Sequence, residues 1–325
     1  MINVGIVGLG RIAGVMADTL EQMEDASLYA VGSRSLEKAQ AFNTKYQAPQ
    51  AYGSYDDLFH DEKVDLVYIA TPHTQHYEVA RRAMECGKNV LVEKAFTVNA
   101  KETEKLIAVS KKTGCLLCEA IWTRFLPMRT MIDDVVASGI IGSVNYLTAN
   151  LGYFSAWKDR MHDPNLAGGA LLDVGVYPLN FAVMVLGKDI QDIKATMIPY
   201  KDTFMDATDQ ITLVYKDKKM ADLTASMVGR TDRRGLICGS EGYIEVENIN
   251  NPEKLSVFDN TGRLMQVVVA PKQISGYEYE VRSCAKAISE KKRECPEMMH
   301  SETLFMMNLY DSIRKDWGLK YPTEE

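Results

Sequence analysis

Apolar runs alternate with amphipathic stretches over the first 120 residues of the chain. The runs have the length of buried strands, and the stretches between them have the periodicity of helices. This alternation is typical of βαβ units, and it predicts an α/β fold with a parallel sheet. The expected strands are 2–7, 27–32, 64–70, 88–92 and 114–121. One expected helix follows the glycine turn and runs to about residue 23, and the others are 36–46, 75–86 and 100–112.

The second half of the chain has a different pattern. Residues 168–186 form a small-residue and apolar helical stretch that is interrupted by Gly175 and Pro178. Strand-like runs then follow one another without intervening helices, which indicates a mainly antiparallel sheet. The expected strands are 144–153, 193–200, 210–215, 221–228, 234–238, 243–246, 255–258 and 264–269, and further helices are expected at 126–138, 277–290 and 301–315.

Length and composition limit the classes of protein that fit. A chain of 325 residues exceeds what one hydrophobic core usually accommodates, so two domains are expected, 1–120 and 121–325. Packing of the C-terminal helices back on the first domain is left open. The net charge of −7 argues against a nucleic-acid partner or an acidic membrane. The apolar run 181–186 is too short to span a bilayer, and without a basic leader the expected location is the cytoplasm.

Cysteine and histidine spacings give no reason to expect a metal. The six cysteines have no framework spacing. Cys115 and Cys118 lie three residues apart on an expected strand, so their thiols should point to opposite faces. His73 and His76 lack an evident third ligand, and we expect no metal there.

A glycine-rich turn, residues 8–13, lies between the first strand and the first helix. Gly8 allows a tight turn, and Gly10 lets the backbone approach a pyrophosphate. The free N–H groups at the start of the helix then face the anion. This context predicts a Rossmann dinucleotide-binding domain, with Arg11 and Ile12 also beside the cofactor.

The end of the second strand predicts which cofactor binds. An NAD site usually has an acidic residue here, which accepts hydrogen bonds from the ribose. This chain has Ser33 and Arg34, with Lys38 one turn further on. A hydroxyl and two cations suit a 2′-phosphate, so we expect NADP rather than NAD, although ordinary surface charges would give the same pattern.

Lys94 directly follows the almost wholly apolar strand 88–92 and Glu93. The carboxyl ends of parallel strands are where open α/β sheets bind ligands. Beside a nicotinamide, the Lys94 ammonium could stabilise negative charge on a substrate oxygen. Glu93 should point to the other face and brace the loop.

Asp173 and Tyr177 are four residues apart, so on a helix they share a face. The tyrosine hydroxyl could exchange a proton with an alcohol or carbonyl, provided that a nearby cation lowers its pKa. Pro178 disfavours helical backbone at Tyr177 and predicts a kink there. A core tyrosine and a capping aspartate are the alternative interpretation.

Five segments together resemble the glucose–fructose oxidoreductase, inositol dehydrogenase and rhizopine catabolism family of NAD(P)-dependent oxidoreductases. They are 8–13, 70–76, 92–94, 119–127 and 168–177, and the resemblance covers essentially the whole chain. The segment 119–127 and the tyrosine at 177 most resemble the dimeric dihydrodiol dehydrogenase branch. Members of that branch oxidise trans-diols and some sugars with NADP.

The resemblance implies that Lys94 and Tyr177 act together in proton transfer and that Asp173 assists. It also implies an open second-domain sheet used for dimerisation or tetramerisation. Two positions depart from the family. Ala95 stands where proline is usual, and Tyr177 stands where many members have histidine. The cofactor is further implied to contact Thr71, Pro72, His76, Glu93 and Lys94.

Aromatic and arginine residues are concentrated where the two domains are expected to join. Aromatic rings can stack on a sugar or an aromatic diol, and arginines can bind hydroxyls, although burial in the core is equally expected for the rings. The candidate substrate-binding residues are Trp122, Arg124, Phe154, Trp157 and Arg160.

The sequence therefore predicts an NADP-dependent oxidoreductase that transfers hydride between the nicotinamide and a secondary alcohol or carbonyl of a sugar, polyol or trans-diol. Two alternatives remain open at this point. One is a glycosidase that retains its cofactor and works by transient oxidation and elimination. The other is a dinucleotide-binding regulator without turnover.

Overall fold

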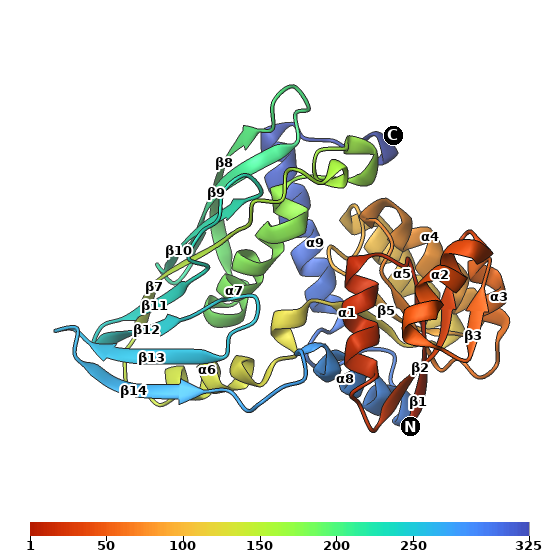
Figure 1. Cartoon of the computed structure of the whole chain (residues 1–325). Coiled ribbons are helices and arrows are strands. Elements are labelled where there is room, and N and C mark those ends of the chain that lie inside the picture. The colour runs from red at the N-terminus through yellow and green to blue at the C-terminus, as the bar shows by residue number, and fades with distance from the viewer. Residues whose placement is uncertain (325) are drawn as a thin grey trace. The chain divides into compact units, whose positions relative to one another are not determined.

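A computed structural model describes residues 1–324, which form two compact units. Unit 1 contains Met1–Ile121 and Gln273–Asn308, and unit 2 contains Trp122–Lys272 with the residues from Leu309 onward. The chain therefore returns to unit 1 after the second sheet is complete. Figure 1 shows the elements in their order along the chain.

Unit 1 contains a six-stranded parallel sheet with the strand order β3-β2-β1-β4-β5-β6. The direction of winding reverses between β1 and β4, which is the position at which dinucleotides bind in this fold. The parallel sheet predicted from the sequence is thereby confirmed. Its strands are β1 (Ile2–Val7), β2 (Ala26–Gly32), β3 (Gln50–Tyr52), β4 (Leu66–Ile69), β5 (Asn89–Glu93) and β6 (Leu117–Ala120).

The helices of unit 1 agree with the expected ones, except that some begin or end a few residues away and that one short helix, α3, was not expected. The first ends at Leu20 rather than at residue 23. The short elements β3 and α3 were not expected, because three strand residues and a six-residue helix are too brief to show a period. The helices are α1 (Arg11–Leu20), α2 (Leu36–Tyr46), α3 (Tyr55–His60), α4 (His73–Glu85), α5 (Ala100–Thr113) and α8 (Tyr277–Ser289), while α9 (His300–Trp317) begins in this unit and continues into unit 2.

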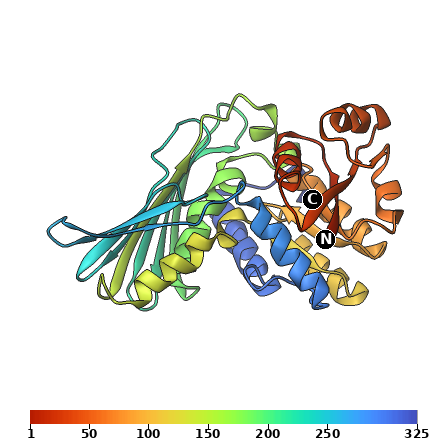
Figure 2. The same cartoon turned by 60° about the horizontal axis from the view of Figure 1, so that its bottom comes forward.

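Unit 2 contains an eight-stranded sheet with the order β14-β13-β12-β11-β7-β10-β9-β8. Only β7 and β10 pair in parallel, so the sheet is mainly antiparallel, as the sequence predicted. Figure 2 shows the β13–β14 hairpin, in light blue, at one edge. The strands are β7 (Val144–Gly152), β8 (Ile190–Pro199), β9 (Asp206–Tyr215), β10 (Met220–Ser226), β11 (Gly235–Gly239), β12 (Gly242–Val246), β13 (Lys254–Asp259) and β14 (Leu264–Val269).

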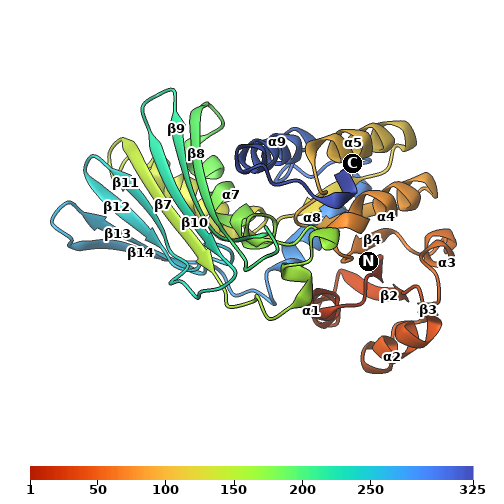
Figure 3. The same cartoon turned by 90° about the horizontal axis from the view of Figure 1, so that it is seen from above.

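The two faces of this sheet differ. Helix α7 (Val176–Leu186) packs on β7 and β10, and Figure 3 shows it on one side of the sheet. The strand register places Leu147, Leu223 and Ile244 on this inner face, and all three are completely buried. The other face has no helix over it in Figures 1 and 3. By the same register it presents the exposed apolar side chains Tyr146, Ile198, Met220, Met265, Val267 and Val269.

The predicted helical stretch 168–186 is divided in the structure. A short π-helix, η4 (Leu171–Gly175), leads directly into α7, so the irregularity lies immediately before Tyr177 and Pro178. Pro164–Leu186 is long and apolar enough to cross a membrane by length and composition. However, 83% of its most apolar window is buried inside the structure, as in a core helix. The remaining helices of unit 2 are α6 (Pro127–Ala137) and the 3₁₀ turns η1 (Trp122–Arg124), η2 (Asp159–Met161), η3 (Pro164–Leu166) and η5 (Pro322–Glu324).

Candidate active site

The glycine turn after β1 packs against the end of β4. Gly8 has φ +86°, a conformation that favours glycine. A Cβ at this position would lie 2.5 Å from the carbonyl carbon of Ala70 and from the backbone nitrogen of Thr71. The turn and the Thr71 loop thus meet at the point where the strand order reverses.

The residues at this turn fit a dinucleotide. Gly10 is the N-cap of α1 and provides no side-chain cap, so the first N–H groups of the helix are available to an anion. A Cβ on Gly10 would meet nothing within 4 Å, which leaves space for a pyrophosphate. The Thr71 hydroxyl is buried without a hydrogen-bond partner among residues 1–324. Of the adjacent candidates, Arg11 is exposed and Ile12 is half-buried.

A pocket of ≈ 410 Å³ opens beside the end of β2. Arg34 lines it together with Tyr55, Thr74 and Arg82. Arg34 is exposed, as is Lys38 on the first turn of α2, and neither forms an ion pair within the described chain. The hydroxyl oxygen of Ser33 accepts a 3.4 Å hydrogen bond from the Ser35 N–H. The pocket therefore offers a cation and an aromatic ring to the adenosine half of a dinucleotide.

Lys94 follows the last residue of β5 and is half-buried. Before it, the buried Glu93 accepts a hydrogen bond from the Tyr68 hydroxyl, consistent with a bracing role. The Lys94–Ala95 peptide bond is cis, at the position where the family usually has proline.

His76 joins the two loops that follow β4 and β5. Its Nε2 lies 2.7 Å from the Thr71 carbonyl oxygen, and its Nδ1 lies 3.0 Å from the Ala95 carbonyl oxygen. Burial lowers the pKa of His76. The buried ring therefore fixes the backbone directly after Lys94 instead of presenting a free edge to a ligand.

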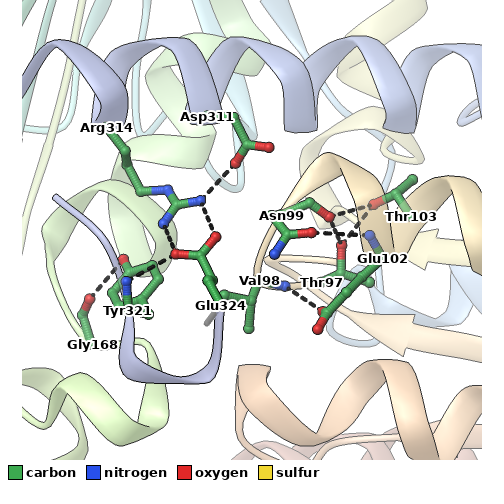
Figure 4. A network of polar contacts seen from close by, with 10 residues as sticks. All are labelled: Thr97, Val98, Asn99, Glu102, Thr103, Gly168, Asp311, Arg314, Tyr321 and Glu324. Carbon is green, nitrogen blue, oxygen red and sulfur yellow. Dashed lines mark hydrogen bonds and ion pairs between the residues drawn. The ribbon is translucent and has the colours of Figure 1, made fainter. Parts of the chain in front are cut away.

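The chain beyond Lys94 is held by a second set of hydrogen bonds (Figure 4). The Thr97 and Thr103 hydroxyl oxygens are 2.6 Å apart, and the Thr97 hydroxyl also donates to the Asn99 carbonyl. The Asn99 side chain accepts from the Glu102 N–H at 3.0 Å and so caps the start of α5. Lys94 thus extends from a loop that is fixed at both ends.

In unit 2, Asp173 lies on η4 and Tyr177 on the first turn of α7. Asp173 is paired with Arg160, with 3.1 Å between Arg160 Nη2 and Asp173 Oδ1. Tyr177 is buried, with 7% of its surface exposed. Arg160, a candidate for substrate contact, is thus also the partner of the candidate catalytic carboxylate.

The segment that leads to Asp173 is anchored to β9. The Leu171 N–H donates to Asp206 Oδ2 at 2.5 Å, and the Gly169 N–H donates to the Met161 carbonyl at 2.7 Å. A Cβ on Gly169 would lie 2.0 Å from Asp206 Oδ1, so this position requires glycine. The Tyr321 hydroxyl donates to the Gly168 carbonyl at 3.1 Å (Figure 4).

Asp206 has a second buried acid beside it, Asp209. Both carboxyl groups are completely buried, and they are close enough to share a proton. Burial raises the pKa of Asp206 to about 6. Burial and the charge of Asp206 also raise the pKa of Asp209. The fold therefore favours a protonated form of the pair.

The first turn of α7 is held through Asn180. The Asn180 amide donates to the Val176 carbonyl at 2.8 Å and to the Tyr310 hydroxyl at 3.0 Å. Arg124 is buried and its Nε donates to Asn180 Oδ1 at 2.6 Å. Arg124, another candidate for substrate contact, thus supports the helix that carries Tyr177.

The aromatic candidates differ in exposure. Phe154 and Trp157 are 67% and 69% exposed, whereas Trp122 is half-buried. No sequence pattern singles out Asp206, Asp209 or Asn180. They belong to no motif, and Asp206 and Asn180 bind Leu171 and Tyr310, which lie far away in the chain.

Comparisons with known proteins identify the class of this enzyme. Residues 2–120 match the oxidoreductase family with an NAD-binding Rossmann fold, and residues 130–245 match the GFO/IDH/MocA C-terminal domain. The trans-1,2-dihydrobenzene-1,2-diol dehydrogenase of Danio rerio is 30% identical over 98% of this chain and 97% of its own length. The human dehydrogenase of the same name is 28% identical over 99% and 98%.

Solved structures agree with this assignment. KijD10, a 3-ketoreductase from Actinomadura kijaniata in complex with NADP and TDP-benzene, has a TM-score of 0.88 and 25% identity over 97% of each chain. An aldose–aldose oxidoreductase from Caulobacter crescentus, 21% identical over 98% of this chain and 97% of its own, shares the fold with a TM-score of 0.86.

The chain belongs to the GFO/IDH/MocA family of oxidoreductases. It is an NAD(P)-binding dehydrogenase or reductase that acts on hydroxyl or keto groups. Within the family it belongs with the dihydrodiol dehydrogenase branch.

Proposed function

We propose that this protein is an NADP-dependent oxidoreductase that interconverts a secondary alcohol and a carbonyl on a sugar, polyol or trans-diol. The observation that carries the proposal is the position of Lys94. It extends from the carboxyl end of β5, next to the strand pair β1 and β4 at which the glycine turn lies. Diols and sugars are the substrates named for the similar dehydrogenases and oxidoreductases.

Two cations support NADP over NAD. Arg34 lines the pocket at the end of β2, Lys38 is on the following turn, and no acidic residue occupies the usual ribose position. The similar 3-ketoreductase was solved with NADP. In this proposal Gly8, Gly10, Arg11, Ile12 and Thr71 surround the pyrophosphate, and Ser33, Arg34 and Lys38 hold the 2′-phosphate. Pro72, Glu93 and Lys94 form the wall on the nicotinamide side, and His76 fixes the backbone behind that wall.

A nicotinamide bound at this site would accept or return the hydride. In the oxidative direction the Tyr177 oxygen takes the proton of the substrate hydroxyl, and the carbon that carries this hydroxyl gives up the hydride. The Lys94 ammonium stabilises the negative charge that develops on the substrate oxygen. Asp173 assists by holding the polar side chains around the hydroxyl, and Arg160 keeps Asp173 in place. In the reductive direction Tyr177 returns the proton.

Unit 2 supplies the substrate-binding side chains and the surface for self-association in this proposal. Phe154 and Trp157 are exposed aromatic rings available to stack on a substrate, with Trp122 and Arg160 as further contacts. Arg124 contributes through Asn180. The helix-free face of the eight-stranded sheet joins two or four copies of the chain. Free cysteines throughout the described chain fit a cytoplasmic location.

The proposal is tested by incubating the full-length protein with a panel of sugars, polyols and trans-diols, each with NADP⁺ and with NAD⁺. Absorbance of the reduced nicotinamide is the readout. We expect turnover with at least one diol or sugar and a higher kcat/KM with NADP⁺. Release of a glycoside leaving group without net redox change would instead indicate a cofactor-retaining glycosidase. Tight NADPH binding without any turnover would indicate a regulator.

A further inference from the structure

Three cysteine thiols, none of them assigned a role above, meet in the interior of unit 1. The sulfur atoms of Cys118, Cys284 and Cys295 all lie within 4.8 Å of one another. Those of Cys284 and Cys295 are 3.8 Å apart, and neither residue is in a disulfide. None of the three side chains is more than 1% exposed.

The folding of the α8–α9 connection against β6 creates this cluster. β6 is the edge strand of the parallel sheet. The Leu117 N–H donates to the Arg293 carbonyl at 2.9 Å, and His300 Nε2 lies 2.9 Å from the Leu117 carbonyl oxygen. These contacts bring the connection that contains Cys295 beside Cys118, while Cys284 comes from the preceding helix α8. Three separate segments therefore contribute one thiol each.

The spacing of the sulfur atoms fits a metal ion. A structural zinc site is tetrahedral with Zn–S distances of about 2.3 Å, which places two ligand sulfurs roughly 3.8 Å apart. Cys284 and Cys295 have this separation, and Cys118 needs to move little to reach it. Hydrogen-bonded thiols without a metal would also pack at such distances.

A buried carboxyl group on α8, the helix that carries Cys284, distinguishes a metal site from thiols that only pack together. Glu280 precedes Cys284 by four residues and so lies on the same face of α8. It is completely buried, and neither of its oxygens has a hydrogen-bond partner among residues 1–324. Burial raises the pKa of Glu280, and the neighbouring Glu93, Cys295 and Glu119 raise it further. A cation is the natural partner for such a group.

We propose that Cys118, Cys284 and Cys295 form a structural site for a thiophilic d¹⁰ cation, with Zn²⁺ as the ion that we test and with the buried Glu280 on the same face of α8 as Cys284. Binding replaces the three thiol protons, which are released to solvent, and involves no oxidation or reduction. The site ties α8 and the α8–α9 connection to the edge of the dinucleotide-binding sheet. None of the three cysteines takes part in the proposed reaction.

The first experiment measures metal content. Because the sulfur atoms are buried, the full chain is expressed with added zinc, so that the ion is present during folding, and is purified without chelators. We expect about one zinc per chain. Cys118→Ser, Cys284→Ser and Cys295→Ser each lower that content at least tenfold. The matched control is Cys115→Ser, since Cys115 is buried on the same segment but its thiol contacts the Met84 carbonyl instead.

Two measurements on the unaltered chain remove the dependence on how the variants fold. Zinc X-ray absorption should show three sulfur neighbours at about 2.3 Å. Protein refolded with Co²⁺ should show a thiolate-to-metal charge-transfer band, and Glu280→Gln should weaken Co²⁺ binding. Turnover in the substrate panel should be unchanged by Cys284→Ser, so failure here is distinguishable from failure of the enzymatic proposal.

Several results would overturn the site. They are a zinc content that the three serine variants leave unchanged, a chain that stays metal-free after refolding with zinc, and a Cys284–Cys295 disulfide found by mass spectrometry. A zinc absorption spectrum dominated by nitrogen and oxygen neighbours would also exclude it.

Discussion

Arg160 and Asp173 form an ion pair in which Arg160 Nη2 lies 3.1 Å from Asp173 Oδ1. The arginine side chain is 43% exposed and the aspartate side chain 13%, so the pair lies at the edge of unit 2 with the carboxylate on the inner side. Arg160 belongs to the 3₁₀ turn η2, and Asp173 belongs to the π-helix η4 that precedes Tyr177. The pair therefore determines where the candidate assisting carboxylate points.

Replacing Arg160 should lower turnover without unfolding the protein. We expect Arg160→Gln to reduce kcat by roughly 10- to 100-fold, because a misplaced assisting group loses this much, while Tm changes little. Arg160→Lys should recover part of the loss, since it retains the charge but not the geometry. Steady-state kinetics and thermal melts check both statements. An unchanged kcat in Arg160→Gln would show that the ion pair has no role in catalysis.

The cofactor preference should depend on two side chains after β2. We expect Arg34→Ala combined with Lys38→Ala to raise the Kd of NADPH roughly 10- to 100-fold, as the loss of charged hydrogen bonds to a phosphate predicts. The Kd of NADH should hardly change. The control is Lys45→Ala, which removes an exposed lysine of the same helix that is paired with Asp18. Equal losses for both cofactors would contradict the assignment of the 2′-phosphate.

Stability should fall with rising pH because of the buried acid pair. Burial raises the pKa of Asp206 from its ordinary value of 3.8 to about 6, and the pKa of Asp209 is raised as well. The native state therefore holds protons that the unfolded chain releases, and this stabilisation is complete below pH 4 and is lost as pH rises through about 6. In Asp209→Asn the amide donates a hydrogen bond at every pH, so this variant does not need the proton that the acid pair holds.

Melting temperatures from pH 4 to 8 test this linkage. The parent should lose stability relative to Asp209→Asn across that range, and the difference between the two curves removes the contributions of other groups. His76 contributes to stability with the opposite sign. Burial lowers its pKa, so its contribution destabilises the native state as pH falls. Parallel curves for the parent and Asp209→Asn would contradict the shared proton.

Self-association should depend on the helix-free face of the eight-stranded sheet. Met220 and Val267 are exposed there, at 40% and 46%. We expect Met220→Glu combined with Val267→Glu to convert the protein to monomers in light scattering, because exposed apolar side chains on an uncovered sheet face are typical of an interface. Met299→Glu changes an exposed methionine of unit 1 and should leave the mass unchanged. A parent that is monomeric would contradict the proposal directly.

The parallel sheet and the glycine turn could be predicted from the sequence because their signals are local. The helix Leu36–Tyr46 was predicted to the residue, since Ser35 caps its start and the chain adopts a left-handed conformation at Gln47 after its end. The β3 strand was missed, because three residues carry no period. The π-helix before Tyr177 was anticipated only as a kink at Pro178.

Contacts between distant segments could not be predicted. Asp206 anchors Leu171 from another strand, and no spacing rule connects the two residues. The divergence of Cys115 and Cys118 followed from strand geometry. The convergence of Cys118 with Cys284 and Cys295 depends on where the α8–α9 connection folds, which the sequence pattern does not report. The contact of the buried Arg124 with Asn180 likewise joins distant segments and could not be predicted from the sequence.

The most direct test of the central claim is a double-mutant cycle on Lys94 and Tyr177, with the single-turnover rate of nicotinamide reduction measured on a substrate that the panel identifies. We predict that Lys94→Met and Tyr177→Phe each slow this rate by about 10²- to 10⁴-fold with NADP⁺ binding nearly intact. If the two side chains act as one unit, the double variant will be no slower than the slower single variant. Losses that multiply in the double variant, or full activity in either single variant, would contradict the account.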